Sequence, residues 1–181
     1  MLPEKTQKRN IGPGPDGRSF LFGAQTPDAP ACSAGTRHQS VSLKIASALL
    51  VYAESANLGQ VLQAPYDVVL SRNFIVQPDI LFVETRRTGL IGERALRGAP
   101  DVAIEILSWE TREKDMKKKR NVYSTHAVKE YWTVDPESGL VEVLRWSELG
   151  YATQGIFGRS DHLSSPAFPR LRLPLRKVFG M

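Results

Sequence analysis

The sequence is poor in the features that mark several protein classes. Its 181 residues contain one cysteine, Cys32, so an internal disulfide and a zinc site built from cysteines are both excluded. The longest apolar stretch, Ala46–Ala53, is far shorter than the roughly 20 residues that a membrane-spanning helix needs. The first residues also lack the basic and then apolar pattern of a signal peptide. We therefore expect a cytoplasmic protein without a membrane partner.

Most of the chain also lacks a surplus of either charge. The formal net charge is +5, but residues 159–181 hold five basic side chains against one acidic, and residues 1–30 hold four against three. The remaining residues, 31–158, are balanced at 15 of each sign. Charge alone therefore supports a nucleic-acid partner only weakly.

The length suits one compact domain, which is preceded by a segment without periodicity. Residues 1–35 are rich in glycine, proline and small side chains, so we expect an irregular, poorly ordered N-terminal segment. The predicted elements of residues 36–181 are helices over 38–56 and 111–126, strands over 68–70, 75–83 (interrupted early by Pro78), 102–107, 130–134, 140–146 and 151–157, and a docking tail over 163–179. Their order favours an α/β fold, with a mixed β-sheet flanked by helices.

A carboxylate interrupts the most apolar of these strands. Glu105 lies inside Val102–Leu107, where an ionised side chain is costly unless it is paired or bound to a metal. Side chains alternate along a strand, so Asp101 and Glu105 share one face. Asp79 follows Pro78 in the preceding strand. Two or three carboxylates are therefore predicted to converge at the sheet, as oxygen ligands that suit Mg²⁺ or Mn²⁺.

A lysine interrupts an otherwise apolar helical stripe. Lys119 shares its face of the second helix with a set of apolar residues, Met116, Val122, Tyr123 and Ala127. A lysine on that face must extend to solvent or meet a carboxylate, whereas Lys117 and Lys118 point elsewhere. The pattern predicts that Lys119 reaches the carboxylates of the adjoining strand.

Structural roles explain some of these residues equally well. Asp101 also suits a turn or cap, and Glu105 also suits a purely structural pair with Lys119. The cluster Lys117–Arg120 is typical of a solvated helix face. The three histidines, His38, His126 and His162, show no metal-ligand spacing and are interpreted as structural or exposed.

Several motifs follow one another in a fixed order. They are Gln77-Pro78-Asp79-Ile80, Gly98–Ser108, the trio Asp115, Lys119 and Tyr123 at four-residue spacing, and Val128–Pro136. From about His38 to Phe179 this order and spacing resemble the Uma-type restriction endonuclease family, a branch of the PD-(D/E)XK nuclease superfamily. A lone Pro-Asp pair would mean little, so the ordered set carries the resemblance.

The resemblance implies a restriction-endonuclease-like fold over residues 36–181 and hydrolysis of DNA phosphodiester bonds with Mg²⁺ or Mn²⁺. By position, it implies that Asp79 and Glu105 are catalytic metal ligands. Leu107 stands where the superfamily usually has a lysine, two residues after the glutamate. The resemblance assigns that catalytic role to Lys119 on the helix.

The sequence departs from the family pattern in two further places. Residues 1–35 do not resemble the hairpin with an acidic residue that usually opens the family. Trp109-Glu110-Thr111 stand where the family favours Pro-Ser-Thr. A copy that has lost a metal ligand would fold without cutting DNA, so an inactive module stays among the hypotheses.

Three functional hypotheses follow. The first is a Mg²⁺-dependent DNA endonuclease, for which a homodimer would suit the cutting of both strands. The second is a catalytically inactive nuclease fold that binds DNA or a protein partner. The third is a structural domain with buried ion pairs and no nucleic-acid role. Metal binding separates the first from the others, and salt-dependent DNA binding without cleavage favours the second.

Overall fold

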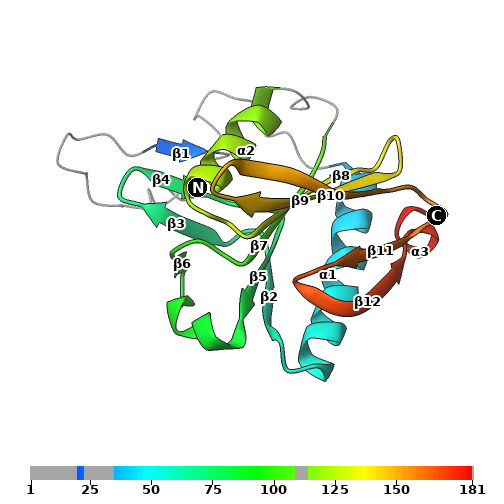
Figure 1. The fold of residues 1–181 in the computed structure, drawn as a ribbon, viewed down its shortest axis with the longest axis horizontal. Coiled ribbons are helices and arrows are strands. Elements are labelled where there is room, and N and C mark those ends of the chain that lie inside the picture. The colour runs from blue at the N-terminus through cyan, green and yellow to red at the C-terminus, as the bar shows by residue number, and fades with distance from the viewer. Residues whose placement is uncertain (1–19, 23–34, 109–113, 181) are drawn as a thin grey trace, which may run out of the picture.

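A six-stranded mixed sheet organises the fold (Figure 1). The computed structural model describes residues 20–22, 35–108 and 114–180. The strand order is β10 (Gly150–Phe157), β9 (Leu140–Ser147), β8 (Glu130–Asp135), β7 (Val102–Ile106), β5 (Ile80–Glu84) and β2 (Gly59–Gln63). Strands β7 and β8 are parallel, and the other neighbours are antiparallel. The predicted α/β class with a mixed sheet is therefore confirmed.

Smaller elements surround this sheet. A four-stranded sheet has the order β1 (Phe20–Phe22), β4 (Phe74–Val76), β3 (Asp67–Ser71) and β6 (Ala95–Arg97). The hairpin β11 (His162–Ser165) and β12 (Phe168–Pro174) forms a third. The helices are α1 (Thr36–Ser55), the 3₁₀ helix η1 (Thr85–Leu90), α2 (Lys114–Thr125) and α3 (Leu175–Phe179). No helix in the described part of the chain is long and apolar enough to cross a membrane.

Helix α1 forms because apolar residues recur on one face. Val41, Ile45 and Leu49 are buried at spacings of four, which places them against the sheet. The helix ends where Asn57 adopts a left-handed backbone with φ of 51°, a conformation that asparagine tolerates. The backbone N–H of Leu58 then donates to the carbonyl of Ala53 and closes the last turn. The predicted helix and its stop are confirmed.

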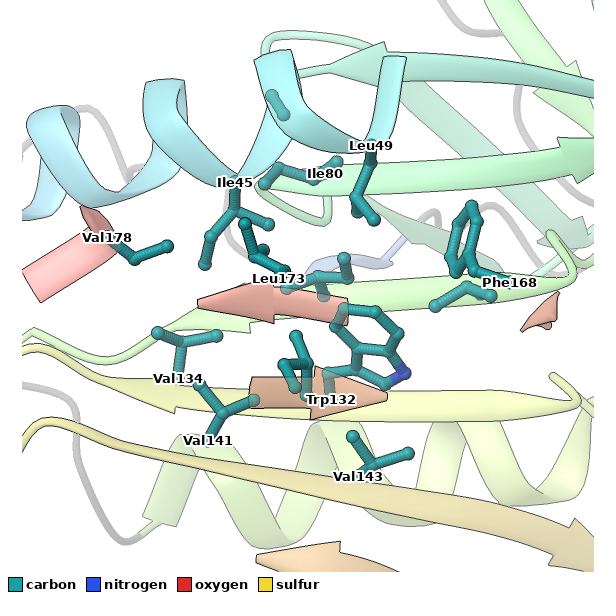
Figure 2. Packing of buried hydrophobic residues seen from close by; sticks show 14 of the residues in the cluster. Ile45, Leu49, Ile80, Trp132, Val134, Val141, Val143, Phe168, Leu173 and Val178 are labelled. Atoms are coloured by element: carbon teal, nitrogen blue, oxygen red, sulfur yellow. The ribbon is translucent and has the colours of Figure 1, made fainter. Parts of the chain in front are cut away.

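The side chains on the two faces of the central strands belong to two separate apolar clusters. Even-numbered β7 residues and Trp132 face α1 and the C-terminal hairpin, with Trp132 beside Phe168 at a ring-centroid distance of 5.8 Å (Figure 2). Ala103 and Tyr131 face the opposite way, into a cluster with Tyr123 of α2. Because β7 is covered on both faces, all five of its residues are buried, as the predicted central strand required.

One detail of the predicted elements is confirmed and another was wrong. The strand expected over 75–83 with an interruption at Pro78 is divided there into β4 and β5, which belong to different sheets, because proline has no N–H to donate to a ladder. Ala127 does not extend the apolar stripe, since α2 ends at Thr125 and Ala127 is exposed with φ of 53°.

The remaining expectations lie partly outside the described residues. The start of the second helix at residue 111 falls there, and so does most of the N-terminal segment 1–35. Within that segment Phe20–Phe22 form strand β1, which pairs in parallel with β4. The predicted docking tail forms β11, β12 and α3, and Leu171, Leu173 and Leu175 are buried in the cluster beneath α1.

A buried carboxylate joins the C-terminal hairpin to the sheet. Glu130 on β8 is only 3% exposed, and one of its oxygens accepts from Ser165 Oγ at 2.5 Å and from Trp132 Nε1 at 3.0 Å. Its other oxygen accepts the backbone N–H of Ala167 at 2.8 Å. Three donors from two elements therefore depend on one side chain.

We expect Glu130→Ala to destabilise the fold by about 3 kcal/mol, because it leaves these buried donors without an acceptor. Urea denaturation followed by circular dichroism measures the change. Glu137→Ala is the matched control, because Glu137 is exposed and its surface pair with Arg37 is worth little. Equal stability losses in the two variants would contradict this role.

Candidate active site

Two of the predicted site residues lie opposite each other on neighbouring strands. In the antiparallel pairing of β5 with β7, Ile80 faces Ile104, so Asp79 and Glu105 occupy the next opposed positions. Opposed residues of such a pair have Cα atoms about 4.5–5.5 Å apart. The backbone N–H of Ile106 donates to Asp79 Oδ2 at 2.7 Å, which fixes the Asp79 carboxylate at the end of β7. The backbone therefore brings Asp79, which directly precedes β5, and Glu105 to the same end of two neighbouring strands.

Helix α2 supplies two partners to the buried carboxylate of Glu105. Lys119 Nζ lies 2.7 Å from Glu105 Oε2, and the hydroxyl of Tyr123 donates to Oε1 at 2.7 Å. Lys119 and Tyr123 are one helical turn apart, so both side chains leave the same face. The structure therefore brings Lys119 to the strand carboxylates, as the stripe predicted.

Burial dominates the electrostatics of Glu105. Removal from water raises its pKa, the nearby Asp79 carboxylate raises it further, and Lys119 and Tyr123 only partly oppose both, so the pKa reaches about 7. Burial and the Glu105 carboxylate also raise the pKa of Tyr123, which keeps the phenol protonated as a donor. Glu105 is therefore a carboxyl group that exchanges its proton near neutral pH.

His38 is a member of the site that the sequence analysis missed. It stands in the first turn of α1, and its Nε2 lies 3.4 Å from Asp79 Oδ2. The hydrogen bond to Asp79 raises the pKa of His38 more than burial lowers it. Its Nδ1 is buried and has no hydrogen-bond partner among the described residues. No local sequence pattern indicates the contact between His38 and Asp79, because it depends on how α1 packs against the start of β5.

Asp101 does not join the other carboxylates, although it shares their face of β7. Its oxygens contact Arg87 Nη1 at 2.8 Å and Lys129 Nζ at 2.7 Å, and accept the backbone N–H of Glu84 at 2.8 Å. Burial opposes its ionisation, but Lys129, the Glu84 N–H and Arg87 together lower its pKa. Of the two or three carboxylates that the sequence allowed at the site, Asp101 is therefore not one, because it lies at the opposite end of the strand from Glu105 and has structural partners there.

The site offers two carboxylates to a small, hard cation, and these are too few to fill the coordination shell of the ion on their own. Among the residues that the structure describes, no group of three or more His, Cys, Asp or Glu side chains is arranged to hold a metal ion. Asp79 and Glu105 nevertheless offer two adjacent carboxylates, and each carboxylate can accept about four interactions. Mg²⁺ is commonly bound by one or two carboxylates, with water and substrate phosphates completing its shell. The residues therefore fit such an ion.

Comparisons with known proteins agree with this arrangement. Residues 31–176 match the model of the family Uma2, which is described as "Putative restriction endonuclease". A crystal structure of a "putative nuclease" from Anabaena variabilis ATCC 29413 superposes with a TM-score of 0.66 at 18% sequence identity, over 81% of this chain and 82% of that chain. At this identity the likeness concerns the fold. A search of curated proteins gave no match.

The raised pKa of Glu105 predicts a pH-dependent stability in the metal-free protein. The folded state holds a proton that the unfolded state releases above its ordinary pKa of 4.5. Relative to Glu105→Gln, which cannot ionise, wild type should lose stability as the pH rises from 4.5 to about 7. Urea denaturation with EDTA across this range tests the point. A difference between the two proteins that stays constant with pH would contradict it.

Proposed function

The chain belongs to the Uma2 restriction endonuclease family, and we propose that it is a DNA endonuclease that hydrolyses phosphodiester bonds with Mg²⁺ or Mn²⁺. One observation carries the proposal. Lys119 contacts Glu105 at 2.7 Å while Asp79 lies opposite on the neighbouring strand. A pair of carboxylates with an adjacent ammonium is the set of groups that metal-dependent phosphodiester hydrolysis uses. We also infer a cytoplasmic protein that acts on DNA, and a homodimer would present one site to each strand.

Asp79 and Glu105 are the groups that we assign as metal ligands. A bound Mg²⁺ or Mn²⁺ would polarise a phosphate oxygen and lower the pKa of a coordinated water. The chain itself holds both carboxylates ready for this. The Ile106 N–H and His38 fix Asp79 Oδ2, and Tyr123 fixes Glu105 Oε1. Each ligand therefore has a defined orientation before any substrate arrives.

Lys119 is the residue that we assign to transition-state stabilisation. Its side chain is 14% exposed, so the ammonium lies in a partly dehydrated place where its charge acts strongly. Charge develops on the phosphate oxygens during hydrolysis, and an ammonium fixed beside Glu105 offsets it and orients the attacking water. Lys117 and Lys118 are exposed and do not contact Glu105.

A second candidate function rests on the same contact. The Lys119–Glu105 ion pair also stabilises the buried carboxylate without any metal. An inactive nuclease fold that binds DNA or a protein partner would retain this ion pair for stability. That hypothesis predicts a loss of thermal stability in Lys119→Met and no cleavage by wild type. Salt-dependent DNA binding without cleavage would support it.

Plasmid cleavage is the direct test of the proposed enzyme. We expect nicked or linear products with Mg²⁺ or Mn²⁺, none with EDTA, and none from Glu105→Gln, which keeps the shape of Glu105 but removes a charged ligand. Gel electrophoresis of the plasmid over time gives the rate. Cleavage by Glu105→Gln at the wild-type rate would assign the activity elsewhere or to a contaminant.

The three neighbouring lysines separate catalysis from DNA binding. We expect Lys119→Ala to lower the cleavage rate by about a hundredfold or more, because its charge acts in the transition state. Lys117→Ala should mainly weaken DNA binding, and Lys118→Ala is the matched exposed control. Cleavage rates, DNA affinities and melting temperatures are measured for all three. Full activity in Lys119→Ala would end the assignment.

A further inference from the structure

A cavity of about 410 Å³ lies between helix α2 and strands β8 and β9. Its apolar wall consists of Leu107, Met116, Tyr131 and Leu144. Lys117 and Arg120 add two cations from α2, and Thr133 and Glu142 add two polar groups from the sheet. A cavity of this size that combines an apolar wall with a few placed polar and charged groups has the character of a ligand pocket.

The cavity continues directly from the candidate active site. Glu105 pairs with Thr133 in the parallel β7–β8 register, and Thr133 pairs with Glu142 in the β8–β9 register. Adjacent strands are about 4.8 Å apart, so Glu142 lies roughly 10 Å from Glu105 along one row of side chains. Leu107, two residues beyond Glu105, forms part of the wall. Thr133, the ladder partner of Glu105, therefore borders the cavity, so a substrate held at Glu105 would lie next to it.

The groups in the cavity match the parts of one nucleotide. Lys117 and Arg120 are exposed cations that suit a phosphate. The apolar wall suits the face of a base. Glu142 Oε1 accepts from Thr153 Oγ1 at 2.9 Å, and its carboxylate has further capacity to accept from the exocyclic amine of a base.

We propose that this cavity holds one unpaired nucleotide of the substrate, next to the scissile phosphate, and favours a base with an exocyclic amine. This inference rests on the proposed function, whose substrate class it narrows. A base inside a duplex must lose its pairing and stacking to enter a pocket, whereas a base in a single strand has no pairing to lose. The enzyme therefore prefers single-stranded or unpaired DNA.

Binding of dCMP and dUMP to the protein in EDTA tests the pocket without any cleavage. The two nucleotides differ at the base position where only cytosine carries an amine. We expect dCMP to bind about tenfold more tightly than dUMP, and Glu142→Gln to reduce that preference. Lys117→Ala and Arg120→Ala should each weaken dCMP binding by about tenfold. Isothermal titration calorimetry measures the affinities, and circular dichroism confirms the fold.

Lys118→Ala is the matched control, because Lys118 neighbours Lys117 on α2 but does not line the cavity. Equal effects of the Lys117 and Lys118 variants would overturn the proposal. So would the absence of dCMP binding at millimolar concentration, or competition by inorganic phosphate as strong as that by dCMP itself.

The outcome also separates this inference from the proposed function. DNA cleavage by a protein that does not bind dCMP overturns the pocket and leaves the endonuclease. Binding of dCMP by a protein that never cuts DNA supports the pocket and rejects the endonuclease. In an active protein, single-stranded oligonucleotides should be cut faster than duplexes of the same sequence, and equal rates would count against the proposal.

Discussion

The burial of one carboxylate in the central strand sets most of the site. Glu105 lies in β7 with 5% of its surface exposed, where an unpaired charge is very costly. Its two oxygens are satisfied by Lys119 and Tyr123, both from α2. The helix must therefore lie over this end of the sheet in one register. Burial and the nearby Asp79 carboxylate both oppose the ionisation of Glu105, so its pKa is about 7 despite the Lys119 ammonium.

At the other end of the same strand, Asp101 is a buried carboxylate with a structural role. Asp101 has two cationic partners and a backbone N–H, and together they lower its pKa against the effect of burial. Burial raises the pKa of Glu105 first, its one cation only partly opposes this, and the neighbouring Asp79 anion raises the pKa further. Surplus positive charge stabilises a fixed anion, whereas a deficit leaves a group that can exchange a proton for another cation. This contrast supports a ligand role for Glu105 and a fold-stabilising role for Asp101.

Local periodicity explains which parts of the fold and the site could be predicted. The apolar run around Glu105 and the stripe around Lys119 both follow from residues within a few positions of one another. The partners of Asp101 and the approach of His38 to Asp79 depend on elements far apart in sequence, which no local pattern contains. The interruption at Pro78 follows from the sequence, because proline has no N–H for a ladder, whereas the assignment of β4 and β5 to different sheets depends on strands far apart in the chain.

The position two residues after Glu105 lies between the candidate active site and the cavity beside α2. In the resembled superfamily pattern a lysine stands there, on the same face of the strand as the glutamate. In this chain Leu107 holds that position and lines the cavity between α2 and the sheet. A lysine at 107 would place its charge in the apolar wall, whereas Lys119 brings the ammonium to Glu105 from the helix. Because the cation comes from α2, the strand face beside Glu105 carries an apolar side chain at position 107, and that side chain forms part of the cavity wall.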